Sequence, residues 1–141
     1  MKRKATAIWK GTGKEGKGVL NTPSEVFNNT PYSFNTRFED GKGTNPEELI
    51  AAAHAGCFNM ALSFMLVGAG FVAEELDCTA TVVLESKNGG FDVTSIVLDL
   101  NAKIPNINQA KFDELAANAK ANCPISKLFN APITLNAKLL S

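Results

Sequence analysis

The chain has 141 residues, enough for one domain with a hydrophobic core, and we expect residues 1–141 to form a single domain. Fourteen basic and fourteen acidic side chains balance, which argues against nucleic-acid binding and against a polybasic membrane-surface protein. The first residues contain no apolar stretch typical of a signal peptide, and three cysteines without a CxxC pair favour a reducing compartment. We therefore expect a cytoplasmic protein.

The first forty residues predict a short antiparallel meander. Residues 4–10 alternate in polarity, and glycines between positions 11 and 18 indicate a turn. Extended structure is expected to resume at Val19 and to continue through Tyr32 and Phe34. On this pattern Arg37 lies on a strand.

A long uncharged helix is predicted next. Asn45 is a helix cap, Pro46 suits the first helical position, and Glu48 stands where it completes a capping box. Residues 49–73 carry no charge and exceed the roughly 20 residues that span a bilayer. Their alanine and glycine content and their acidic flanks favour a helix buried on all sides in a soluble protein.

The second half predicts a hairpin, a helix and a last strand. Residues 76–85 and 91–104 read as strands joined at Asn88-Gly89, and residues 108–122 read as an amphipathic helix. A short turn or helix from Cys123 leads to a strand over 133–139. The order favours an α+β fold with antiparallel sheets and a long central helix, not a βαβ series. A second copy of the chain is the simplest cover for that helix, so we expect a homodimer with the helix near the two-fold axis.

Two cysteines far apart in sequence are the candidate chemical groups. If Cys57 and Cys123 meet, the chain holds a reactive thiol and a resolving thiol; otherwise both are packing residues. Helix N-termini stabilise thiolates, so a break at Gly56 would favour Cys57, and Pro124 would place Cys123 near an N-cap. We favour the break. Cys78 alternates inward on a strand and is expected in the core.

Two further possibilities are a role for His54 and a zinc site. His54 is either a base near Cys57 or, as its apolar helix favours, a hydrogen-bonded structural residue. A Cys3His zinc site from the three cysteines and His54 would need spacings that resemble no zinc module. We therefore expect no metal and no cofactor.

Four segments together resemble the OsmC/Ohr family, and most closely its OsmC branch. They are PYSFNTRF at 31–38, GTNPEEL at 43–49, AAHAGCFNMAL at 52–62 and NCPIS at 122–126. The resemblance covers essentially the whole chain. It implies an intertwined α+β homodimer that reduces organic hydroperoxides, with two active sites at the subunit interface.

The resemblance also implies residue roles. The peroxidatic cysteine falls on Cys57, the resolving cysteine on Cys123, the conserved arginine on Arg37 and its glutamate partner on Glu47. The implied reductant is a dithiol, a dihydrolipoyl group carried on a protein. Ten residues of straight helix separate Glu47 from Cys57 by roughly 15 Å. Either the helix breaks near Gly56, or Arg37 and Glu47 act on a cysteine of the partner chain.

In the implied mechanism, the Cys57 thiolate attacks the peroxide, becomes a sulfenic acid and condenses with Cys123 to a disulfide. Apolar walls would favour organic peroxides over hydrogen peroxide. The candidate wall residues are Phe34, Phe38, Phe58 and Leu128. The alternative is a non-catalytic stress-response interaction protein whose cysteines only pack.

Overall fold

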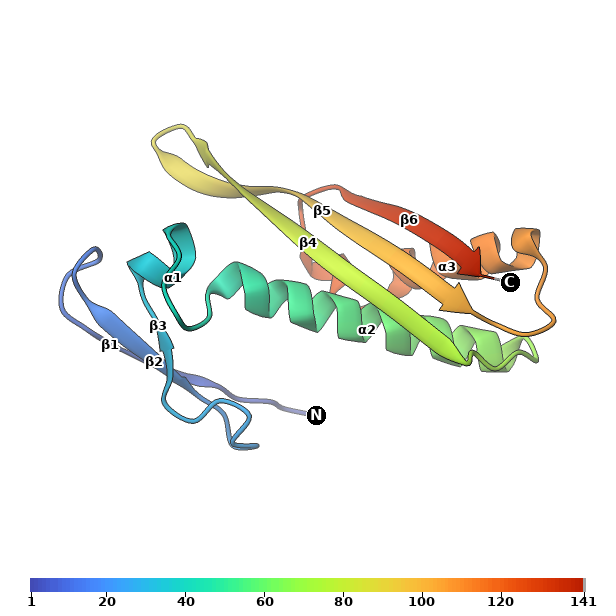
Figure 1. The fold of residues 1–141 in the computed structure, drawn as a ribbon, viewed down its shortest axis with the longest axis horizontal. Coiled ribbons are helices and arrows are strands. Elements are labelled where there is room, and N and C mark those ends of the chain that lie inside the picture. Colours follow the sequence, from blue (N-terminus) through green and yellow to red (C-terminus); the bar gives the residue numbers. More distant parts are fainter. Residues whose placement is uncertain (141) are drawn as a thin grey trace. The chain divides into compact units, whose positions relative to one another are not determined.

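The computed structural model describes residues 1–140 and resolves two compact units, Met1–Leu49 and Ile50–Ser141 (Figure 1). The first unit contains three strands and a short helix: β1 (Thr6–Lys10), β2 (Lys17–Asn21), β3 (Thr30–Tyr32) and α1 (Phe34–Phe38). The strands form an antiparallel sheet in the order β1–β2–β3, which confirms the predicted meander.

The segment that contains Arg37 is a helix, so the expectation of a strand there is wrong. Ser33 caps α1: its hydroxyl accepts from the Thr36 N–H, and the Thr36 hydroxyl accepts from the Ser33 N–H. This reciprocal capping box satisfies two backbone donors and starts the helix immediately after β3.

Helix α2 (Pro46–Gly68) begins and ends where the sequence predicts. The Asn45 side chain accepts from the Glu48 N–H at 2.8 Å, whereas the Glu48 carboxylate accepts from Thr44 instead of closing a capping box. At the other end Gly70 takes a left-handed φ of 86°, and the Phe71 N–H bonds the Leu66 carbonyl in a Schellman arrangement.

Helix α2 does not break at Gly56, so the expected interruption is wrong. One glycine inside a helix costs only about 1 kcal/mol, and residues on both sides of it are helix-formers with a buried face. Cys57 therefore lies in the helix interior and gains nothing from a helix N-terminus.

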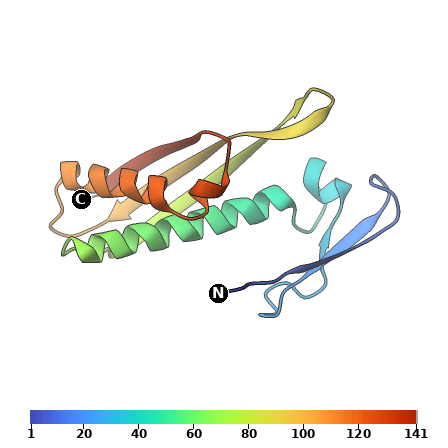
Figure 2. The same ribbon diagram turned by 180° about the vertical axis from the view of Figure 1, so that it is seen from behind.

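The second unit is a three-stranded sheet with helices on one face. Figures 1 and 2 show α2 and α3 on the same face of the sheet, with the strands in front in Figure 1 and the helices in front in Figure 2. Its elements are β4 (Glu75–Lys87), β5 (Gly90–Lys103), α3 (Gln109–Asn122), a 3-10 turn η1 (Ser126–Leu128) and β6 (Ile133–Leu140). Asn88 and Gly89 both take positive φ and form the predicted two-residue hairpin turn.

Strand β6 pairs parallel to β5, so the expectation of antiparallel sheets throughout is wrong. The β5–β6 connection carries α3 and η1 and is long enough for a crossover. The class is α+β with two small sheets and a long helix. The core of the second unit lies between the sheet and the helices, and α3 contributes the face predicted for it: Phe112, Leu115, Ala116 and Ala119.

Helix α2 buries only one face in the single chain. His54, Phe58, Leu62 and Leu66 are buried. On the opposite face Met60, Phe64 and Val67 are 63%, 74% and 61% exposed. Helix α2 is long and apolar enough to cross a membrane by length and composition.

Candidate active site

The structure brings the Cys57 and Cys123 thiols together inside the second unit. Both cysteines are free thiols; Cys57 is half-buried on α2, and Cys123 is fully buried at the end of α3. The two side chains are hydrogen-bonded to each other, and Cys57 also interacts with the backbone of Ile125. This second interaction favours the thiolate, which identifies the Ile125 N–H as the donor.

Burial raises the pKa of the Cys57 thiol. The hydrogen bond with Cys123 raises this pKa further, while the Ile125 N–H lowers it. No cation among the described residues of the second unit contributes to this balance. The thiol therefore lacks, among the groups of its own unit, the positive charge that an activated thiolate needs.

Cys123 is the C-cap of α3, not an N-cap as expected. Its N–H donates to the Ala119 carbonyl at 2.9 Å, and η1 begins three residues later with Ile125 as its N-cap. Pro124 lies in the turn between α3 and η1. Proline has no backbone N–H to continue the hydrogen bonds of α3, so the helix ends before it, and the next helix does not begin there.

Arg37 and Glu47 form a two-pronged ion pair in the first unit. Arg37 Nη2 donates to Glu47 Oε1 at 2.6 Å, and Arg37 Nε donates to Oε2 at 3.1 Å. The Glu47 side chain is 14% exposed and that of Arg37 is 35% exposed. A bidentate pair fixes the plane of the guanidinium and leaves its other N–H groups available.

Aromatic residues surround Arg37. A pocket of about 120 Å³ in the first unit is lined by Trp9, Tyr32, Phe34, Arg37 and Phe38, among others. The Phe34 and Phe38 rings lie 4.8 Å apart, and the guanidinium lies 5.2 Å from the centre of the Phe38 ring. The pocket combines apolar walls with one oriented cation.

Comparison with known proteins supports the family that these residues suggest. The family model "OsmC-like protein" matches residues 39–138. Peroxiredoxin OsmC of Escherichia coli is 50% identical over 139 residues, which cover 99% of this chain and 97% of that protein. The chain belongs to the OsmC family.

Solved structures of OsmC-family members share the fold. The organic hydroperoxide resistance protein OhrB of Bacillus subtilis matches with a TM-score of 0.71 and 26% identity over 96% of this chain and 98% of that one. The OsmC-like protein of Mycoplasma pneumoniae matches with a TM-score of 0.79 over 100% and 99% at 16% identity, which concerns the fold alone. As a soluble OsmC-family protein, the chain uses α2 as a core helix.

The other residues expected at this OsmC-family site lie as follows. Phe58 is fully buried in the core of the second unit, whereas Leu128 is 74% exposed. Cys78 packs against that core as expected, and burial, then Asp77 and Asp99, raise its pKa to about 11. Within residues 1–140, no group of three or more metal-ligating side chains is arranged to hold a metal ion.

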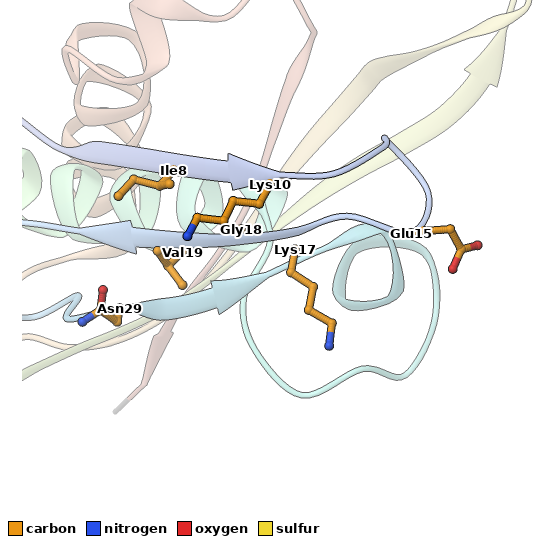
Figure 3. A pocket seen from close by; sticks show the side chains of 7 residues that line it. All are labelled: Ile8, Lys10, Glu15, Lys17, Gly18, Val19 and Asn29. Atoms are coloured by element: carbon orange, nitrogen blue, oxygen red, sulfur yellow. The ribbon is translucent and has the colours of Figure 1, made fainter.

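A second hollow, of about 560 Å³, lies over β1 and β2 in the first unit (Figure 3). Ile8 and Val19 face each other across the two strands, and Glu15 and Lys17 point outward. Its lining residues include neither cysteine nor arginine. Size alone therefore does not locate the candidate chemistry.

Sequence reasoning missed three contributors. Ile125 acts through its backbone N–H, which no side-chain pattern reports. Trp9 and Tyr32 meet at 5.4 Å beside the Arg37 pocket because β1 and β3 both flank β2. For Trp9 and Tyr32, the available signal was the predicted meander, because in a meander the first and third strands both lie beside the second.

Proposed function

We propose that this OsmC-family protein is a thiol-dependent peroxidase that reduces organic hydroperoxides to alcohols, and hydrogen peroxide less well, in defence against oxidative and osmotic stress. The observation that carries the proposal is the contact between the Cys57 and Cys123 thiols. The 50% identity to Peroxiredoxin OsmC over 99% of the chain supports it independently.

The reaction runs in three steps. The Cys57 thiolate attacks the terminal peroxide oxygen, the O–O bond breaks, and the protonated alkoxide leaves as the alcohol. Cys57 is then a sulfenic acid. The Cys123 sulfur attacks the Cys57 sulfur, a disulfide forms, and water leaves. An external dithiol, which we assign to a dihydrolipoyl group on a protein, reduces the disulfide and restores both thiols.

Arg37 supplies the positive charge that Cys57 lacks in its own environment. A guanidinium within about 4–6 Å lowers an acid's pKa by 1–3 units, which offsets the rise caused by burial. Glu47 holds the guanidinium in one plane through its two hydrogen bonds. Because α2 is unbroken, we assign Arg37 and Glu47 to the Cys57 site of a partner chain.

This assignment requires a homodimer, and the outer face of α2 supports one. Met60, Phe64 and Val67 follow one another at helical spacing and are all more than half exposed. An apolar stripe of this kind on a soluble protein marks an interaction surface, and a two-fold axis lets the same stripe cover itself. Both units then belong to one OsmC-like domain, residues 1–141, as the family match across both units suggests.

The substrate's organic group binds against aromatic walls. Phe34 and Phe38 line the pocket that contains Arg37. Leu128 is exposed in the segment that follows Cys123, and we assign it to an apolar wall of the substrate site. Phe58 has no exposed surface and supports Cys57 from the core side. Apolar walls stabilise an alkyl or aryl group and give hydrogen peroxide nothing to contact. We place the enzyme in the cytoplasm, where dithiol reductants keep it active.

Peroxide consumption tests the proposal. Wild-type protein is assayed with cumene hydroperoxide, tert-butyl hydroperoxide and hydrogen peroxide, each with dihydrolipoamide, dithiothreitol or thioredoxin as reductant. We expect turnover with organic peroxides and dihydrolipoamide, loss of turnover in Cys57→Ser, and near-normal turnover in the matched control Cys78→Ser. Full activity in Cys57→Ser would eliminate the mechanism, and no turnover by wild type with any reductant would favour a non-catalytic protein.

A further inference from the structure

We propose that His54 and Ser126 form a buried latch that holds the segment 123–129 against α2 and thereby positions Cys123 and the Ile125 N–H for reaction with Cys57. This inference rests on the proposed function of the two cysteines and adds two residues to which that function gives no role. Both are positioning residues; neither touches the substrate in this assignment.

The contact itself is short and buried. His54 Nε2 lies 2.8 Å from Ser126 Oγ, with His54 fully buried and Ser126 8% exposed. The His54 ring also meets the Phe129 ring edge-on, with centroids 5.1 Å apart and planes inclined by 63°. The imidazole therefore makes two separate contacts with residues of one segment, and it holds that segment in return.

Each residue of the latch lies close in sequence to one of the reacting cysteines. His54 lies three residues before Cys57, so the two side chains leave the same face of α2 on successive turns. Ser126 lies three residues after Cys123, and Ile125 is its neighbour. Fixing Ser126 to His54 therefore fixes both groups that contact the Cys57 sulfur.

Besides the two interactions that Cys123 and Ile125 make with Cys57, the other backbone hydrogen bonds of the segment are local. The Lys127 N–H donates to the Cys123 carbonyl, and the Leu128 N–H donates to the Ile125 carbonyl. These bonds shape the turn without joining it to α2. The hydrogen bond between His54 and Ser126 does join the two, and buried polar links of this kind select one geometry among several packed ones.

The imidazole is suited to a fixed, neutral role. Burial lowers the pKa of His54, which keeps the ring uncharged near neutral pH. His54 Nδ1 is buried and has no hydrogen-bond partner among the described residues. An unpaired buried polar atom such as His54 Nδ1 is energetically unfavourable. A histidine at this position near Cys57 is accounted for if its other nitrogen, Nε2, makes a contact that the reaction needs.

The step that depends on the latch is disulfide formation. The Cys57 sulfenic acid and the Cys123 thiol form an S–S bond and release water, with no other oxidant. The same bond forms without peroxide when diamide, an azo oxidant, takes two electrons and two protons from the thiols and becomes a hydrazine. Misplacement by about 1 Å costs such a step on the order of 100-fold, so loosening the segment slows both routes.

The experiment compares Ser126→Ala and His54→Phe with wild type, Ser126→Thr and Ser95→Ala. Ser126→Thr keeps the hydroxyl, and Ser95→Ala removes a half-buried hydroxyl on β5 outside the latch. Disulfide formation after diamide addition is followed by quenching and mass spectrometry. Dimedone trapping after one equivalent of cumene hydroperoxide reports the lifetime of the Cys57 sulfenic acid, and thermal unfolding reports the fold.

We expect Ser126→Ala and His54→Phe to form the disulfide at least about tenfold more slowly by both routes and to accumulate more dimedone adduct. Ser126→Thr should restore the rate, and Ser95→Ala should leave it unchanged. Faster hydrogen exchange over residues 123–129 in Ser126→Ala would support the same conclusion. Wild-type rates in folded Ser126→Ala and His54→Phe would overturn the latch. A wild-type protein that closes its disulfide with diamide but not with peroxide would overturn the proposed function and leave the latch standing.

Discussion

Replacing Phe64 by glutamate should convert the proposed dimer into monomers. A phenylalanine side chain buries roughly 150–250 Å² in total, and Phe64 is 74% exposed in one chain, so a partner covers up to about 150 Å². At about 25 cal/mol per Å², this burial contributes up to about 3.75 kcal/mol per subunit and up to about 7.5 kcal/mol per dimer. Such a loss corresponds to roughly a 10⁵-fold weaker dissociation constant.

Size-exclusion chromatography with light scattering, over a range of protein concentrations, measures this change. Val26→Glu is the matched control, because Val26 is as exposed as Phe64 (75%) but lies outside α2. We expect the control to remain dimeric and Phe64→Glu to elute as a monomer at micromolar concentration with its peroxidase activity lost. A Phe64→Glu protein that dimerises as tightly as wild type would refute the assignment of this helix face to the interface.

Three further predictions concern the thiols. Mixed dimers of Arg37→Met chains with Cys57→Ser chains should recover about half of the wild-type activity per dimer. The intact Cys57 of the first chain then meets the intact Arg37 of the second, so one of the two sites is complete. Activity no higher than that of the two parent variants would place Arg37 at the Cys57 site of its own chain. Cys123→Ser should reduce one equivalent of peroxide to form a Cys57 sulfenic acid, and a second equivalent should oxidise it to sulfinic acid, detectable by mass spectrometry. Undiminished turnover without this overoxidation would argue against resolution by Cys123. Because the pKa of Cys78 in the folded chain is raised to about 11, this thiol contributes stability at neutral pH that is lost as the pH rises from about 9 through 11. Chemical denaturation should show that the free energy of unfolding falls less at alkaline pH in Cys78→Ala than in wild type, by up to about 2 kcal/mol. The same dependence of the unfolding free energy on pH in both proteins would contradict the raised pKa.

Local chemistry in the sequence predicted most element boundaries. Asn45-Pro46 marks the start of α2, Asn88-Gly89 the hairpin turn, and Asn108 the start of α3, whose N-cap it is. Each of these signals acts through a backbone hydrogen bond or a positive φ within a few residues, so it can be read without knowing the fold.

Two features of the fold depend on information that local patterns lack. Alternation predicts β6 but not the strand beside it, and the parallel pairing with β5 follows from the crossover through α3. Helix α1 has only five residues, too few to distinguish a period of 3.6 from alternation; the Ser33–Thr36 capping box was the available signal.

In the candidate site, too, some features could be predicted from the sequence and others depend on the fold. Residue type suggests the chemistry of Cys57 and Cys123, whereas Arg37 is singled out only by the resemblance to the family. The ion pair with Glu47 gives Arg37 a fixed orientation. The mid-helix position of Cys57 is different. Whether a helix breaks at Gly56 depends on packing on both sides. The unbroken helix removes a helix end as the source of thiolate activation, and the proposed function assigns that role to Arg37.

The most direct test of the account is a thiol count before and after one equivalent of cumene hydroperoxide, followed by peptide mapping. We predict that the reduced chain titrates three thiols, that the oxidised chain titrates one, Cys78, and that the map contains a Cys57–Cys123 bridge. Three thiols after peroxide treatment, or a bridge that includes Cys78, would contradict it.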